Sequence, residues 1–171
     1  GVTKFTQAVK AVFSNRKIFK SINIETRNAV ICVDEILDEA KDNIDNVTVG
    51  RTDLARSYFD SKIQPDSEFI LNLIEKLSHK VCSHGLTLTV GGSITKSSIE
   101  RFKQYKENFG GRLFSIETRK IVLPSHQMLE KEKSLTEALF FEELYLSNKL
   151  ENEVWLSHSD RVRLTDLKKR I

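Results

Sequence analysis

Short apolar runs alternate along the chain with longer stretches in which apolar residues recur every three or four positions. A short apolar or β-branched run is typical of a strand, and a three-to-four-residue period is typical of a helix that buries one face. The first stretch with the helical period spans residues 2–14, and Asn15 is a reasonable stop. The pattern therefore predicts that the chain opens on a helix.

The predicted strands and helices then follow one another in strict alternation. The strands are predicted at residues 18–24, 46–50 and 86–90, with a fourth strand or strand-like segment that starts at 113 and ends at Pro124. The helices are predicted at 29–41, 65–85 and 97–109, with a capping box at 97–100 and a loop or short helix at 51–64. From Ser125 the pattern is helical, with a possible restart at 134–137 and one face made by Leu129, Leu135, Leu139, Phe140, Leu144 and Leu150.

Strands that alternate with helices at a spacing near 30 residues predict parallel βα units with right-handed crossovers. Four such units are half of a (β/α)8 barrel, which has about 250 residues. The chain is thus either the carboxy-terminal half of a larger TIM-type barrel or a small open sheet. Because a helix comes first with no strand before it, we favour the barrel. We expect an α/β half-barrel over residues 1–124 and a helical extension over 125–171.

Composition is that of an ordinary soluble globular protein, at 171 residues with 39% hydrophobic and 30% charged. The net charge of +3 comes from 27 basic and 24 acidic residues spread along the chain, so we expect neither nucleic-acid nor membrane binding. No apolar stretch approaches the roughly 20 residues that span a bilayer, and we expect a cytoplasmic protein. Cys32 and Cys82 have no CxxC spacing, which favours two reduced and mostly buried thiols in helices.

Two carboxylates follow two neighbouring strands of this arrangement. Glu25 closes the first apolar run, and Asp53 comes shortly after the second. Parallel strands end at one edge of the sheet, where α/β folds place their chemistry. Carboxylate oxygens are the ligands that a hard divalent cation prefers, and two of them leave positions open for substrate and water. The pair therefore predicts a metal site.

Four motifs, each just after a predicted strand, resemble the HpcH/HpaI aldolase/citrate lyase family. They are Ile-Glu-Thr at 24–26, Val-Gly-Arg-Thr-Asp-Leu at 49–54, Val-Gly-Gly-Ser-Ile at 90–94 and Glu-Thr-Arg-Lys at 117–120. The resemblance covers about residues 1–124. It implies a (β/α)8 barrel that makes or breaks carbon–carbon bonds next to a keto acid or an acyl-CoA thioester with Mg²⁺ or another divalent ion such as Mn²⁺.

Carried over to this chain, the resemblance implies that Glu25 and Asp53 bind the metal. Backbone amides around Gly50, Arg51 and Thr52 would hold the carboxylate of a pyruvate-like or oxaloacetate-like substrate. The other substrate-binding candidates are Gly91, Gly92 and Glu117. Breaking a bond beside a carbonyl generates an enolate, which a bound cation stabilises.

The chain departs from the family pattern in two respects. The family uses an arginine, and often a glutamate, from the first half of the barrel, which this chain does not contain, so we assign no catalytic residue. Arg51 stands where many members have a small or apolar residue, and it either binds an extra anionic group or reaches solvent.

Each candidate also has a purely structural interpretation. Glu25 or Asp53 is then a helix cap or turn residue, and Gly91 with Gly92 only allows a tight turn. In the same interpretation, Glu117 pairs with Arg119 or with the sheet edge. Two histidines, His79 and His84, fall near a helix end on the edge opposite the acids, where a solvated role is expected.

The tail contains more apolar side chains than a helix on a barrel needs, among them Phe140, Phe141, Leu144, Tyr145 and Leu146. We expect this surface to form a homo-oligomer contact. The basic end, residues 161–170, is expected to be a solvated helix face.

The first functional hypothesis is an enzyme, a metal-dependent carbon–carbon lyase or aldolase that acts on a keto acid or acyl-CoA. The alternatives are a non-catalytic relative or partner-binding half-barrel, and a phosphate-binding protein that uses Gly91 and Gly92 as the cradle.

Overall fold

A computed structural model describes residues 1–13, 16–131, 133–152 and 158–170. Asn15, the predicted stop of the first helix, lies outside these residues. The described part contains one five-stranded sheet in the order β1-β2-β3-β4-β5, in which β1 to β4 are parallel and β5 is antiparallel to β4. The strands are β1 Ser21–Ile24, β2 Asn46–Gly50, β3 Thr87–Gly91, β4 Leu113–Glu117 and β5 Val122–Pro124.

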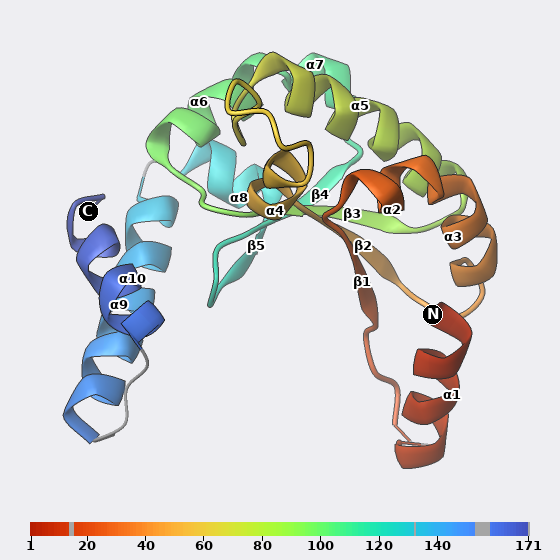
Figure 1. The fold of residues 1–171 in the computed structure, drawn as a ribbon, viewed down its shortest axis with the longest axis horizontal. Helices are drawn as coiled ribbons and strands as arrows, with labels where there is room; N and C mark the ends of the chain where they lie inside the picture. Colours follow the sequence, from red (N-terminus) through yellow and green to blue (C-terminus); the bar gives the residue numbers. More distant parts are fainter. Residues whose placement is uncertain (14–15, 132, 153–157, 171) are drawn as a thin grey trace.

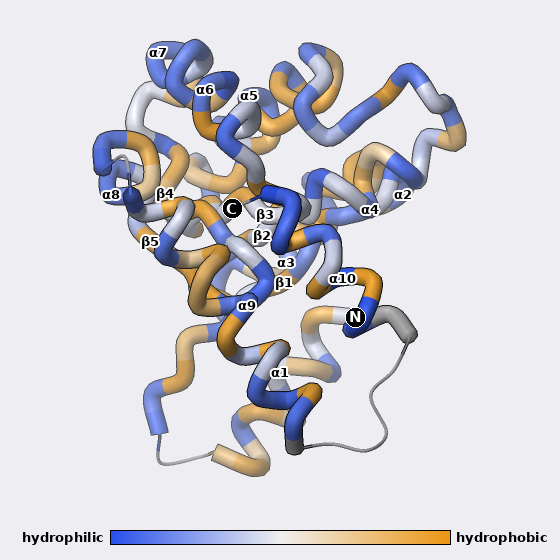
Figure 2. The backbone as a smooth tube through the Cα atoms, turned by 90° about the vertical axis from the view of Figure 1, so that its left-hand side faces the viewer, coloured by the Kyte–Doolittle hydropathy of each residue, from blue (hydrophilic) through white to orange (hydrophobic). Residues whose placement is uncertain are grey.

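Helices cover one face of the arched sheet, while α1 and the α9–α10 pair stand at its two ends (Figure 1). Both α1 and α9 mix hydrophobic and hydrophilic residues along their length (Figure 2). The helices are α1 Val2–Val12, α2 Arg27–Ile31, α3 Val33–Ala40, α4 Arg51–Arg56, α5 Glu68–Ser83, α6 Lys96–Gln104, α7 Lys106–Phe109, α8 Ser125–Glu130, α9 Ser134–Asn152 and α10 His158–Lys168. None of those described is long and apolar enough to cross a membrane.

The two faces of the sheet differ in chemistry because side chains alternate along each strand. The helix-covered face is apolar and includes Val47, Val49, Leu88, Val90 and Ile116, all of them fully buried. The opposite face carries hydroxyl and amide side chains that bond across strands: Asn46 donates to Ser21 at 2.8 Å, Thr89 donates to Asn46 at 3.1 Å, and Thr89 and Ser115 lie 2.6 Å apart. This hydrogen-bonded polar face leads up to the carboxyl edge of the strands.

Several predicted boundaries need correction. The first strand starts at Ser21 instead of residue 18, and the helix predicted at 29–41 is two helices that meet at Cys32. The helix predicted at 97–109 is capped by Thr95, whose hydroxyl accepts from the Ser98 amide at 3.1 Å, and it breaks at Tyr105. Residues 122–124 are a separate strand, because Pro124 and its neighbours turn back to pair with β4.

Side-chain burial corrects two further predictions. Cys32 is exposed and Cys82 is half-buried, so the thiols are free but not mostly buried. In the tail, α9 does begin at Ser134. Its buried face carries Leu135, Ala138, Leu139, Glu142 and Leu146, whereas Phe140 and Leu144, predicted for the inner face, are exposed. The exposed apolar side chains of α9 agree with an oligomer contact, which stays a prediction.

Candidate active site

Four residues form a row across the carboxyl edge of the polar face: Glu25, Gly50, Gly91 and Glu117. Gly50 pairs with Gly91 in the β2–β3 register, and Glu117 follows the paired residues of β3 and β4. A Cβ on Gly50 would lie 2.9 Å from Oε2 of Glu25, and one on Gly91 would lie 3.4 Å from Cβ of Glu117. The glycines therefore leave the space into which the flanking glutamates extend.

The row forms part of the wall of a cavity of about 550 Å³. Strand ends and the segments after them supply most of its lining, including Glu25, Gly50, Thr52, Asp53, Gly91, Gly92 and Glu117. The rest comes from α9, from α10 and from the turn after α10, and it includes Arg163, Asp166 and Arg170. The sequence-predicted candidates thus lie together around one cavity, with the exception of the Arg51 side chain.

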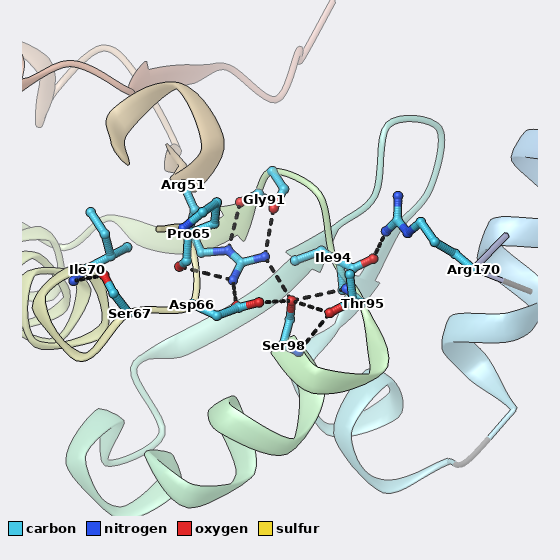
Figure 3. A network of polar contacts seen from close by, with 11 residues as sticks. Arg51, Pro65, Asp66, Ser67, Ile70, Gly91, Ile94, Thr95, Ser98 and Arg170 are labelled. Atoms are coloured by element: carbon cyan, nitrogen blue, oxygen red, sulfur yellow. Dashed lines mark hydrogen bonds and ion pairs between the residues drawn. The ribbon is translucent and has the colours of Figure 1, made fainter. Parts of the chain in front are cut away.

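Arg51 is fully buried, and protein atoms hold its guanidinium on every side (Figure 3). It forms an ion pair with Asp66, and its Nη2 approaches Ser98 Oγ at 3.3 Å. The guanidinium also lies 4.9 Å from the centre of the Phe102 ring. Burial lowers the pKa of Arg51, against the opposing effect of Asp66. The prediction that this side chain binds an anionic group or reaches solvent is therefore wrong.

The buried guanidinium shapes the cavity indirectly. Its Nε donates to the Gly91 carbonyl at 3.1 Å, and its Nη2 donates to the Gly92 carbonyl at 2.7 Å (Figure 3). Asp66, which precedes α5, also accepts from Ser98 of α6 at 2.9 Å. Arg51 therefore ties the glycine turn after β3 to the starts of α4, α5 and α6.

The start of α4 presents hydrogen-bond donors beside Gly92. The φ angle of Gly92 is +89°, and a Cβ there would lie 2.8 Å from the Thr52 amide nitrogen and 2.9 Å from that of Arg51. Amides in the first turn of a helix have no intrahelical acceptor. The hydroxyl of Thr52 is buried without a hydrogen-bond partner in the described part of the chain. This set of donors suits a carboxylate, and any side chain at residue 92 would obstruct it.

Neither of the two predicted metal ligands is a helix cap. The cap of α2 is Thr26, whose hydroxyl accepts from Ala29 at 3.1 Å, while Glu25 accepts only a long bond of 3.4 Å from Asn23. Asp53 lies in the first turn of α4 and forms an exposed ion pair of 3.7 Å with Arg56. The capping interpretation of the two acids is therefore excluded.

The donor set is suited to a hard divalent cation. Among the described residues no group of three or more His, Cys, Asp or Glu side chains could enclose a metal ion. Mg²⁺ does not need such a cage, since it commonly keeps several waters and binds one or two carboxylates together with the substrate. Glu25 and Asp53, on neighbouring segments around one cavity, offer that number of carboxylates.

Glu117 is a half-buried carboxyl group that lines the cavity. Burial raises the pKa of Glu117. In the described residues its carboxylate has no ion-pair partner, so the interpretation that it pairs with Arg119 fails. The two histidines are elsewhere, as predicted: His79 lies in α5, and His84 follows that helix and approaches the Lys80 carbonyl at 2.8 Å.

The sequence interpretation missed the contribution of α10. Residues 161–170 were expected to be a solvated basic face, but Arg163 pairs with the fully buried Glu142 at 2.9 Å. Arg170 donates to the carbonyl of Ile94, in the segment after β3 (Figure 3). The cluster of basic residues was the only sign of this contribution in the sequence. The packing of α10 against α9 is what brings these side chains to the cavity.

No protein-family model matches the chain, and no curated protein matches it. Among solved structures, a citrate lyase from Burkholderia xenovorans LB400 superposes with a TM-score of 0.54 at 12% sequence identity, over 98% of this chain and 56% of the citrate lyase chain. Citrate synthase SbnG matches with a TM-score of 0.46 at 15% identity, over 90% of this chain and 53% of its own.

The chain spans about half the length of these solved structures. The citrate lyase comparison confirms the predicted fold class. The protein is an α/β half-barrel of mostly parallel strands with a helical tail, and it has the fold of about half of that citrate lyase.

Proposed function

We propose that this chain is the carboxy-terminal half of a divalent-metal-dependent carbon–carbon lyase or aldolase that acts on a keto acid. One observation carries the proposal: two carboxylates, Glu25 and Asp53, line the same cavity as the amide and hydroxyl donors of α4. The shared fold with a citrate lyase and the four motifs after the strands support a relation to the aldolase/citrate lyase family.

Each side chain has a distinct role in this proposal. Glu25 and Asp53 hold the cation, which supplies stabilisation for the negative charge that develops on the substrate's carbonyl oxygen as the carbon–carbon bond breaks. The amides of Arg51 and Thr52, with the Thr52 hydroxyl, bind the substrate carboxylate beside Gly92. Glu117, whose pKa is raised by burial, lines the cavity at the opposite end of the row.

Metal binding tests the proposal directly. We expect calorimetry to detect Mn²⁺ or Mg²⁺ binding that pyruvate tightens, and we expect Asp53→Asn and Glu25→Gln each to weaken it at least tenfold. Asp42→Asn is the matched control, because this acid is exposed and does not line the cavity. Absence of metal binding with and without pyruvate, or equal losses in the Asp53 and Asp42 variants, would contradict the proposal and favour a non-catalytic half-barrel.

A further inference from the structure

The lining of the cavity includes a half-buried arginine, Arg170. Four arginines line the cavity. Two of them form ion pairs, Arg163 with Glu142 and Arg56 with Asp53. Arg119 is exposed. Within the described part of the chain, no carboxylate lies within ion-pair distance of Arg170.

The described residues accept only part of the hydrogen bonds that the Arg170 guanidinium can donate. One terminal nitrogen donates to the Ile94 carbonyl, and Nε is buried without a hydrogen-bond partner in the described residues. Burial lowers the pKa of Arg170 and the charge of Arg163 lowers it further, against the opposing effect of the more distant carboxylates of Glu142 and Asp166. A guanidinium stays charged in proteins. A partly desolvated positive charge with unused donors is stabilised by an anion that enters the cavity.

Arg170 and the predicted metal ligands belong to different strand ends of the cavity. Glu25 follows β1 and Asp53 follows β2, whereas Arg170 contacts the segment after β3. Arg170 therefore reaches the cavity one strand away from Asp53 and two strands away from Glu25.

We propose that Arg170 binds a second anionic group of the substrate, in addition to the keto acid carboxylate. The inference rests on the proposed function, and it narrows the substrate class to keto acids that carry a further carboxylate or phosphoryl-type group. The segment just after α10 thereby determines specificity in a site whose other candidate residues follow the strands of the sheet.

Three analogues separate the contribution of this second group. Pyruvate has one carboxylate, oxaloacetate adds a distal carboxylate, and 3-phosphonopyruvate carries a phosphonate in that place. With Mg²⁺ present, we expect calorimetry on the wild-type protein to show at least tenfold tighter binding of one or both dianionic analogues than of pyruvate. The analogue with the larger preference identifies the anionic group.

We expect Arg170→Gln to remove this preference while the affinity for pyruvate changes less than twofold. Arg170→Lys, which keeps the charge, should retain part of it. Arg161→Gln is the matched control, because this arginine of α10 is exposed and does not line the cavity. Circular dichroism before each titration establishes that the variants are folded.

The failure of this inference is distinct from that of the proposed function. If pyruvate binds but the wild-type protein shows no preference for a dianion, the role of Arg170 is wrong and the proposed function stands. Equal loss of pyruvate and dianion binding in Arg170→Gln also contradicts the inference, because a purely structural role affects all ligands alike. If no keto acid binds the wild-type protein, both proposals are overturned.

Discussion

The buried guanidinium of Arg51 donates a 2.7 Å hydrogen bond to the carbonyl oxygen of Gly92, the residue whose missing side chain leaves room beside the α4 amides. The same charge pairs with Asp66, before α5. One side chain therefore determines where the glycine turn lies relative to three helices. The consequences for stability and for the cavity can be separated by substitution.

Arg51→Met is expected to destabilise the protein by roughly 3–5 kcal/mol, because it leaves Asp66 and two buried carbonyl oxygens without their partner. Urea unfolding measures the loss. Arg56→Met is the control, since this arginine of the same helix is exposed and its ion pair with Asp53 is on the surface. That variant should lose less than ~1 kcal/mol. Similar losses in both variants would show that burial of Arg51 contributes little.

Gly92→Ala tests the close approach of the turn to α4. Its backbone has a positive φ, and the new Cβ would meet two backbone nitrogens at less than 3 Å. Gly111 is a matched control, because its φ of +78° imposes the same conformational cost while nothing lies within 4 Å. We expect Gly111→Ala to cost about 1–2 kcal/mol and Gly92→Ala to cost about 1–3 kcal/mol more, measured by urea unfolding. Equal costs would mean that conformation alone requires glycine at residue 92.

Gly50→Ala is expected to weaken Mn²⁺ binding by about 10- to 100-fold, the range seen when groups that orient a ligand are changed. The reason is that the new Cβ would lie 2.9 Å from Oε2 of Glu25, so the carboxylate must move. The φ of Gly50 is −83°, which alanine adopts without strain. Calorimetry gives the affinity, and a thermal melt gives the stability.

Gly91→Ala is the control for this substitution, because Gly91 pairs with Gly50 across the strands but its Cβ would meet Glu117 at ordinary contact distances. Retention of full Mn²⁺ affinity by Gly50→Ala would argue that Glu25 is not a ligand.

The strands of the sheet could be predicted because their signals are local. Residues 46–50 are β2 with the predicted limits, β3 is shifted by one residue at each end, and β4 starts at residue 113 as predicted. The position of Glu25 and Asp53 at one edge followed from parallel strands alone. The antiparallel β5 was not separable, since Val122 and Leu123 continue the apolar pattern and only their pairing with β4 distinguishes them.

The arginines could not be assigned from the sequence, because their partners are distant along the chain. Arg51 is buried by Asp66 and Ser98, and nothing in the residues around 51 indicates that these groups converge on it. Arg170 reaches Ile94, 76 positions earlier. Charged residues are usually solvated, so a sequence interpretation places them on the surface unless the tertiary structure provides a partner.

The raised pKa of Glu117 predicts a pH-dependent stability difference. Because burial raises the pKa of this carboxyl, the folded state binds its proton more tightly than the unfolded chain does. The stability that the proton contributes is fully present below the unfolded value of about 4.3, and it is lost as the pH rises through the folded pKa. Glu117→Gln has no ionisation to oppose folding, so it should gain stability relative to the wild type as the pH rises.

Thermal melts of both proteins at pH 4 and pH 8 measure this gain. We expect the Tm of Glu117→Gln relative to that of the wild type to be higher at pH 8 than at pH 4 by roughly 1–2 °C, a small value because the carboxyl is only half-buried and solvent screens its charge. Glu107→Gln, at an exposed position of α7 outside the cavity, controls for the general loss of a negative charge. A pH-independent difference for Glu117→Gln would mean that burial does not perturb this carboxyl.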